Sequence, residues 1–314
     1  MVKALVFPGQ GSQVVGMGLN LYNTNSTAKQ IFEQVNENFG SKITDIMFSG
    51  NAEDLTATQN SQVAIASVSI AILEILKQDF KIDISKVFKY TAGHSLGEYV
   101  ALYASNALSL KDTIILLKAR GLAMANAGSL SKGGMAVVLG VEDLNKINDL
   151  INASKIENQT CIIANDNSLG QVVLSGNIEY IDNIILKAKE FGVKALKLSV
   201  SGAFHSPLMQ PAAQNLEKAL ASVEVKSPNI DVIHNVLAGL NSNNTPIKNL
   251  LLQQLTGSVR WRETMNFIIN NQVSTLVECG VGTVLTGLAK RSYPDVARFN
   301  LQSVEDIENF VKTL

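Results

Sequence analysis

Short apolar runs alternate with longer stretches of helical periodicity along most of the chain. Four of the runs are typical of buried strands and lie at residues 3–7, 87–92, 230–234 and 274–279. Strands that are apolar on both faces occur in parallel sheets that are covered by helices on each side. The pattern therefore predicts an α/β fold with a large, hydrolase-like domain built on a mainly parallel sheet.

Helical periodicity, with apolar residues recurring every three or four positions, fills the intervals between these strands. The predicted helices cover 28–38, 61–78, the stretch from the motif at 93–97 to about 106, 110–125, 207–220, 250–255, 264–270 and a last stretch from 283. The segment that follows the first strand, residues 8–13, is rich in residues that permit tight backbone and predicts a turn.

The order of predicted strands and helices changes between residues 133 and 200. Strands are predicted at 135–141, 160–164, 171–175 and 195–200, with helices at 142–153 and 178–191. This β-α-β-β-α-β order is that of the ferredoxin-like split βαβ unit. We therefore predict that residues 131–200 form a small ferredoxin-like domain, inserted into a catalytic domain made of residues 1–130 and 201–314.

The composition and charge of the chain favour a globular protein and argue against several kinds of partner. Hydrophobic residues make up 46% of the 314-residue chain and charged residues 17%, which is globular and not disordered. The net charge is −1 without long runs of one sign, which argues against a nucleic-acid partner. The longest apolar segment, 63–76, is shorter than a membrane span, and the apolar start, 1–7, is shorter than a signal-peptide core. Cys161 and Cys279 fit buried free thiols of a reducing compartment, so we expect a cytoplasmic protein. We also expect no membrane partner and a monomer.

The sequence Gly93-His94-Ser95-Leu96-Gly97 follows a predicted strand and opens a predicted helix. In this G-x-S-x-G arrangement the serine occupies a strained turn, and the flanking glycines allow close backbone approach on both sides. The N–H of Leu96, at the start of the helix, can then stabilise the oxyanion of a tetrahedral intermediate. We therefore predict that Ser95 is the nucleophile of an enzyme that moves an acyl group through a covalent intermediate.

The chain has three histidines that could serve as the base for Ser95. His94 adjoins the serine and points elsewhere around such a turn, so packing is its expected role. His234 lies in a predicted strand, which favours a hydrogen-bonded core histidine. His205 lies in a loop between a predicted strand and a helix that begins with proline, which is a typical position for a catalytic group. By spacing alone, a hydrogen-bonded loop histidine remains the alternative for His205.

Several motifs in the same order together resemble one family, the malonyl-CoA:acyl carrier protein transacylases, which are related to the acyltransferase domains of polyketide synthases. The motifs are residues 7–13 (FPGQGSQ), 93–99 (GHSLGEY), Arg120-Gly121, Asn165, 170–173 (GQVV), 204–209 (FHSPLM) and 284–288 (VLTGL). They extend over essentially the whole chain, which makes the resemblance more specific than the serine motif alone.

The resemblance implies a role for several residues. Ser95 and His205 match the catalytic pair of the family. The backbone N–H of Gln10 matches the one that joins Leu96 in the oxyanion hole. Arg120 matches the residue that binds the malonyl carboxylate, and a guanidinium can grip a carboxylate with two parallel hydrogen bonds where lysine cannot.

Three further residues are implied to contact the substrate. Gln62 matches a glutamine that lines the pocket, and Asn165 is implied as a substrate-binding residue. Phe204 resembles its counterpart in the malonyl-selective members, where it would crowd a branched methylmalonyl group. Leu96 would supply an apolar wall.

The activity that the resemblance implies is transfer of malonyl from malonyl-CoA to the phosphopantetheine thiol of acyl carrier protein, for fatty acid synthesis. It implies no metal and no cofactor, because malonyl-CoA is a substrate. Lys290 and Arg291 are candidates for docking the acidic carrier, although a solvated helix end explains them equally well. The segment 254–261 departs from relatives that often carry Asn or Gln and a Pro there. A backbone carbonyl of Gly257 or Ser258 could still orient His205.

Three other interpretations compete. Polyketide synthesis is the alternative pathway for the same chemistry. A serine thioesterase or esterase is the alternative class, but the chain lacks the His-Gly-Gly-Gly oxyanion motif that many such hydrolases carry, and it has no Asp-Gly pair of the patatin-like lipases. A dinucleotide-binding fingerprint at Gly9-Gln10-Gly11 fails because Val14 stands where the third glycine is required.

Overall fold

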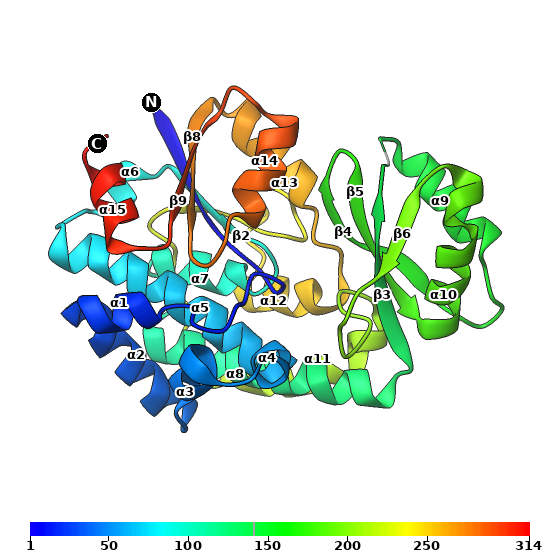
Figure 1. Cartoon of the computed structure of the whole chain (residues 1–314), viewed down its shortest axis with the longest axis horizontal. Coiled ribbons are helices and arrows are strands. Elements are labelled where there is room, and N and C mark those ends of the chain that lie inside the picture. The colour runs from blue at the N-terminus through cyan, green and yellow to red at the C-terminus, as the bar shows by residue number, and fades with distance from the viewer. Residues whose placement is uncertain (141) are drawn as a thin grey trace.

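The computed structural model describes residues 1–140 and 142–314. Two sheets lie side by side, with helices packed on both faces of one and on a single face of the other (Figure 1). Residue 141, the last of the predicted strand 135–141, lies outside the described residues. The α/β fold class predicted from the sequence is confirmed.

The larger sheet has five strands, all parallel, in the order β7-β2-β1-β8-β9. Its strands are β1 (Val2–Phe7), β2 (Tyr90–Gly93), β7 (Asp231–Ile233), β8 (Val273–Cys279) and β9 (Ala297–Leu301). Strand β9 was not predicted from the sequence, because this edge strand pairs only with β8 and its sequence, ARFNL, is mostly half-exposed. The predicted strand 87–92 began too early, since residues Ile84–Val87 form the short helix α6.

Side chains that alternate along the strands enter two separate cores. On β1, Ala4 and Val6 pack toward α13 and α14, whereas Leu5 and Phe7 belong to the core shared with the other helices. This alternation is the geometric consequence of a pleated strand covered on both faces. It explains why the runs are apolar throughout.

Thirteen helices belong to this larger part of the chain within the described residues. They are α1 (Leu19–Thr24), α2 (Ser26–Phe39), α3 (Ile43–Ser49), α4 (Ala52–Thr56), α5 (Thr58–Glu74), α6, α7 (Gly97–Ala104), α8 (Leu110–Leu130), α11 (Gln210–Ala221), α12 (Ile247–Thr256), α13 (Trp261–Asn270), α14 (Val284–Ser292) and α15 (Val304–Val311). A 3₁₀ turn, Pro207–Met209, precedes α11. The short helices α1, α3, α4 and α15 were not predicted from the sequence.

One helical segment, Thr58–Asp79, is long and apolar enough to cross a membrane. Within the described residues, however, 89% of its most apolar stretch is buried inside the protein. It comprises α5 and a π-helical turn, Ile75–Asp79, and lies under the parallel sheet (Figure 1). It is therefore a buried core helix.

The smaller sheet has four antiparallel strands in the order β4-β5-β3-β6. Its elements are β3 (Gly133–Leu139), α9 (Leu144–Ala153), β4 (Cys161–Ser168), β5 (Gln171–Asn177), α10 (Ile178–Lys187) and β6 (Lys194–Lys197). Helices α9 and α10 share one apolar core with the sheet on its outer face (Figure 1). The β-α-β-β-α-β order predicted from the sequence is found. The strand 195–200 was predicted too long, because residues 198–200 leave the sheet.

The smaller sheet is joined through the backbone to the segment between α12 and α13. The N–H of Val259 donates to the carbonyl of Ala164 at 2.8 Å, and the N–H of Asp166 donates to the carbonyl of Val259 at 3.0 Å. Arg262 also pairs with Asp166 at 2.9 Å. These bonds fix the end of β4 against the segment between α12 and α13.

Candidate functional site

Ser95 lies on the sharp turn between β2 and α7. Its φ angle is +54°, a left-handed conformation that L-residues rarely adopt. The turn requires glycine on both sides: a Cβ on Gly93 would come 1.9 Å from the carbonyl carbon of Gly97, and one on Gly97 would come 2.3 Å from the carbonyl oxygen of Phe7. The strained turn predicted from the G-x-S-x-G spacing is therefore present.

His205 meets Ser95 from a distant part of the chain. Its Nε2 lies 2.7 Å from the Ser95 Oγ, and both side chains are buried. Its Nδ1 lies 2.9 Å from the carbonyl oxygen of Gln254 and 3.2 Å from that of Gly257. Because carbonyl oxygens only accept, Nδ1 carries the proton and Nε2 is free to accept the Ser95 hydroxyl proton.

The carbonyl that orients His205 differs in part from the expectation. Gly257 contributes, as one of the two candidates, but the shorter bond comes from Gln254 at 2.9 Å. The hydroxyl of Ser258 donates instead to the carbonyl of Ile163. The last turn of α12 thus presents its free carbonyls to the imidazole, as helix C-termini do.

Burial and the nearby Arg120 guanidinium lower the pKa of His205 to about 3. Burial is the larger cause, because it penalises the charged imidazolium, and the positive charge of Arg120 acts in the same direction. The imidazole is therefore neutral at physiological pH and available as a base.

The lowered pKa of His205 predicts a pH dependence of stability. The unfolded chain binds a proton near pH 6.5 and the folded chain does not, so the free energy of unfolding should fall as the pH drops below 6.5. The contribution of His205 between pH 7 and pH 5.5 is about 1 kcal/mol. Urea denaturation of the wild type and of His205→Gln at both values measures it. Equal pH slopes for the two proteins would contradict the prediction.

Arg120 lies beside Ser95 and is almost fully buried. Its Nη2 donates to the Ser95 Oγ at 3.0 Å and to the Gln254 side-chain oxygen at 3.0 Å, and its Nη1 donates to the Gln62 side-chain oxygen at 2.6 Å. Within the described residues it forms no ion pair with a carboxylate, and its Nε has no acceptor. A buried guanidinium held only by neutral groups can accommodate an incoming carboxylate.

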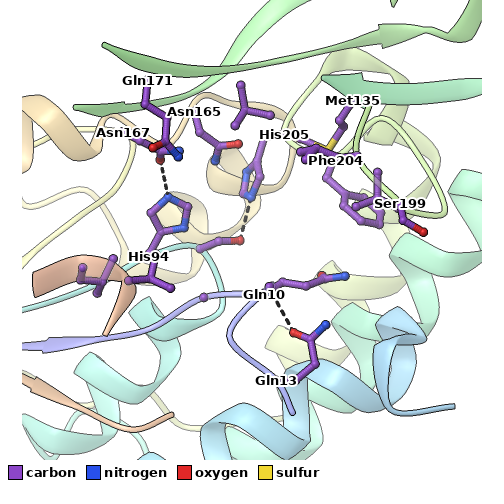
Figure 2. Close-up of a pocket in the computed structure, with 18 of the residues that line it drawn as sticks. Gln10, Gln13, His94, Met135, Asn165, Asn167, Gln171, Ser199, Phe204 and His205 are labelled. Carbon is purple, nitrogen blue, oxygen red and sulfur yellow. Dashed lines mark hydrogen bonds between the residues drawn. The ribbon is translucent and has the colours of Figure 1, made fainter. Parts of the chain in front are cut away.

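A cavity of about 330 Å³ opens over Ser95 and His205, and it is lined by the turns that follow β1 and β2, by the smaller sheet and by α14. Figure 2 shows His94, Asn165, Asn167 and Gln171 along one side of His205, and Met135, Phe204 and Ser199 along the other. Asn165 and Phe204 lie at the cavity wall. Gln62 and Arg120 do not line it; they are buried next to the serine, with Gln62 bracing Arg120.

The turn after β1 lies close to the serine turn. A Cβ on Gly9 would come 2.7 Å from the carbonyl oxygen of His94, so glycine is needed for the close approach. The neighbouring Gln10 lines the cavity together with Ser95. Within residues 1–140 and 142–314, the backbone N–H groups of Gln10 and Leu96 donate to no protein acceptor. Both are free to bind an oxygen that develops negative charge.

The other two histidines are hydrogen-bonded. His234 is 1% exposed and lies 2.7 Å from the Glu98 carboxyl, which confirms a satisfied core histidine. His94 packs against Trp261, with ring centroids 5.6 Å apart, and its Nε2 lies 2.9 Å from the side-chain oxygen of Asn167. It therefore joins the serine turn to the smaller sheet across the cavity, a contact that the sequence did not indicate.

Three polar residues of the site were not predicted from the sequence. Asn235 accepts from the Ser95 N–H at 2.8 Å and donates to the Gly93 carbonyl at 2.7 Å. Gln254 and Glu98 lie behind Ser95 and are fully buried, as Asn235 is. For Glu98 and Gln254 the sequence gives one signal, a polar residue within a helix that has many apolar residues, because a polar group that is buried requires hydrogen-bonding partners.

Residues 4–308 match the acyl transferase domain family. The chain is 40% identical over 314 residues to the malonyl CoA-acyl carrier protein transacylase of Bacillus subtilis, covering 99% of this chain and 96% of that protein. It is 36% identical over 310 residues to the protein of the same name from Synechocystis sp., covering 98% and 100% of the two chains.

Solved structures agree in fold over the whole chain. The acyl-carrier-protein-S-malonyltransferase of Bartonella henselae superposes with a TM-score of 0.95 at 41% identity, covering 100% of this chain and 99% of that one. A malonyl-transacylase solved in complex with a type II PKS acyl-carrier protein superposes with a TM-score of 0.93 at 31% identity, with 100% of each chain covered.

Proposed function

The chain belongs to the acyl transferase domain family, and on that premise we propose that it transfers malonyl from malonyl-CoA to the phosphopantetheine thiol of acyl carrier protein. Relatives that carry this activity in their names match nearly the full length of the chain. The reaction proceeds in two halves, through a malonyl ester on Ser95. Each step uses only side chains and backbone groups of this chain.

In the first half-reaction, the Nε2 of His205 takes the proton of the Ser95 hydroxyl as Oγ attacks the thioester carbonyl. The N–H groups of Leu96 and Gln10 stabilise the negative oxygen of the tetrahedral intermediate. As the intermediate collapses, the C–S bond breaks and His205 returns the proton to the leaving thiolate of CoA. The second half-reaction reverses these steps, with the carrier thiol as the attacking group.

The main support for the proposal is the environment of the Arg120 guanidinium. The guanidinium lies 3.0 Å from the attacking oxygen, is buried, and has only neutral partners among the described residues. The free carboxylate of a malonyl group could replace the Ser95 hydroxyl as an acceptor for Nη2 once Ser95 is esterified. An acetyl group offers no such partner, and two charge-assisted bonds are worth about 3 kcal/mol or more.

The experiment that tests the proposal is intact-protein mass spectrometry after mixing with malonyl-CoA. We expect one malonyl group on the wild type, located on the peptide that contains Ser95, and none on Ser95→Ala. Adding a phosphopantetheinylated carrier protein should remove the adduct and load the carrier. Release of free malonate without loading of the carrier would instead indicate a thioesterase.

The partner and setting are also part of the proposal. Arg291 lies at the rim of the cavity, with its Nη1 3.3 Å from the Gln171 side chain, and with Lys290 it offers exposed positive charge to an acidic carrier. We further propose a cytoplasmic monomer in which residues 131–200 form the inserted domain. Transfer rates to the carriers of fatty acid and of polyketide synthesis, measured side by side, decide which pathway the enzyme serves.

A further inference from the structure

Glu98 is a fully buried carboxyl group in the first turn of α7, directly behind Ser95. One of its oxygens accepts from His234 Nδ1 at 2.7 Å. The other accepts from the Gln254 side-chain nitrogen at 2.7 Å and from the Asn235 N–H at 3.2 Å. None of these bonds reaches the cavity, and the steps proposed above do not use Glu98.

These contacts determine which way the Gln254 amide faces. A carboxyl oxygen that already accepts from a backbone N–H requires a donor from Gln254, so the NH₂ end must point to Glu98. The second proton of that NH₂ group goes to the backbone carbonyl of Ser95 at 2.9 Å. The amide oxygen is left facing Arg120, where it accepts from Nη2 at 3.0 Å.

Gln254 therefore connects Glu98 to three groups of the proposed mechanism, Ser95, Arg120 and His205. Its side chain holds the Ser95 backbone and the Arg120 guanidinium, and its own carbonyl orients His205. It also stands between two opposite charges. Because the amide separates Glu98 from Arg120, the guanidinium stays free of a carboxylate partner within the described residues.

We propose that Glu98 is a positioning residue that fixes the orientation of the Gln254 amide, and through it the geometry of Arg120 and His205. The proposal rests on the function proposed above, and it deepens that function by naming the group that keeps Arg120 ready for a substrate carboxylate. In this scheme the essential property of Glu98 is that it accepts hydrogen bonds.

Two substitutions of Glu98 distinguish the loss of its hydrogen-bond acceptors from a change in its packing. Glu98→Met keeps the approximate volume but removes both acceptors. Glu98→Gln keeps an acceptor for Gln254 and Asn235, and its NH₂ can face His234, whose neutral ring can accept at Nδ1. Glu74→Met is the matched control, since Glu74 is a mostly buried carboxyl group that bonds to Tyr103 at 2.6 Å and to Lys77, away from the groups around Ser95.

We expect Glu98→Met to lower kcat/KM for malonyl-CoA about 100-fold and for acetyl-CoA by about tenfold or less, because both substrates use His205 but only malonyl also uses Arg120. Glu98→Gln should retain kcat/KM for malonyl-CoA within about fivefold of the wild type. Glu74→Met should lower the melting temperature without changing the ratio of kcat/KM for malonyl-CoA to kcat/KM for acetyl-CoA. A general loss of structure cannot produce this pattern.

A second readout needs no substrate. The chain has three histidines, so ¹⁵N-histidine spectra are simple, and the His205 signals are those absent from His205→Ala. At neutral pH we expect a single Nδ1–H tautomer for His205 in the wild type and in Glu98→Gln, and a mixture of tautomers in Glu98→Met. This measurement stays informative if the protein forms no malonyl adduct, so failure of the proposed function and failure of this inference are distinguishable.

The inference is overturned if folded Glu98→Met keeps the wild-type tautomer of His205 and the wild-type preference for malonyl-CoA. It is equally overturned if Glu98→Gln loses the preference as severely as Glu98→Met. If Glu98→Met does not fold, Gln254→Met takes its place, because it removes the amide and retains the backbone carbonyl that orients His205. Wild-type substrate preference in Gln254→Met would then exclude the proposed connection.

Discussion

Replacing His205 with alanine is expected to slow malonylation of Ser95 by about 10²–10⁴-fold, the usual contribution of a general base. The variant leaves the Ser95 hydroxyl without the only imidazole in hydrogen-bonding distance among the described residues. The measurement is the rate at which the malonyl adduct forms after rapid mixing with malonyl-CoA, followed by mass spectrometry.

Two controls make this result specific. Circular dichroism should show that His205→Ala is folded, and added imidazole should restore part of the rate by occupying the space of the lost side chain. His94→Gln should acylate within about tenfold of the wild type, since His94 bonds to Asn167 and not to the serine. Acylation of His205→Ala at the wild-type rate would assign the base to His94 or to water.

Replacing Arg120 with alanine is expected to lower kcat/KM for malonyl-CoA about 100-fold or more. The substitution removes two charge-assisted hydrogen bonds to the substrate carboxylate, worth about 1.5–3 kcal/mol each, and each 1.4 kcal/mol corresponds to about tenfold in rate. Acetyl-CoA has no carboxylate, so its kcat/KM should change by about tenfold or less, and the preference for malonyl should fall. Steady-state transfer with each thioester measures both values.

Arg120→Lys is the matched comparison. It keeps the positive charge but loses the bidentate hydrogen-bonding geometry of the guanidinium. Its preference for malonyl-CoA should therefore lie between those of Arg120→Ala and the wild type. The alanine variant also leaves the side-chain oxygens of Gln62 and Gln254 without their buried donor, so its melting temperature should be recorded. Equal losses with malonyl-CoA and acetyl-CoA would remove Arg120 from carboxylate recognition.

The sequence predicted the fold where apolar patterns are strong. The four buried strands and the order of the smaller sheet were found, because burial on one or both faces leaves a periodic signature. The predictions failed where that signature is weak. Strand β9 lies at an edge with half-exposed residues, and residues 198–200 look like strand although they leave the sheet to line the cavity.

The geometry of the candidate site was likewise predictable from the sequence only where its residues are close together in the chain. The turn that holds Ser95 is local, because β2, the glycines and α7 follow one another within a few residues. The partners of Ser95 are not local: His205 lies 110 residues away, Asn235 lies 140 and Gln254 lies 159. No spacing in the chain encodes a hydrogen bond across such separations.

By its local order alone, the sequence determined that a strained serine turn caps a parallel strand and that a small antiparallel unit follows it. Only the tertiary structure decided how that serine is supported. It brought the end of α12 to His205 and enclosed Arg120 among neutral partners. It also placed the side-chain amide of Gln254 between Glu98 and the guanidinium of Arg120. The physical reason is that burial and hydrogen bonding depend on which distant segments the packed core brings into contact.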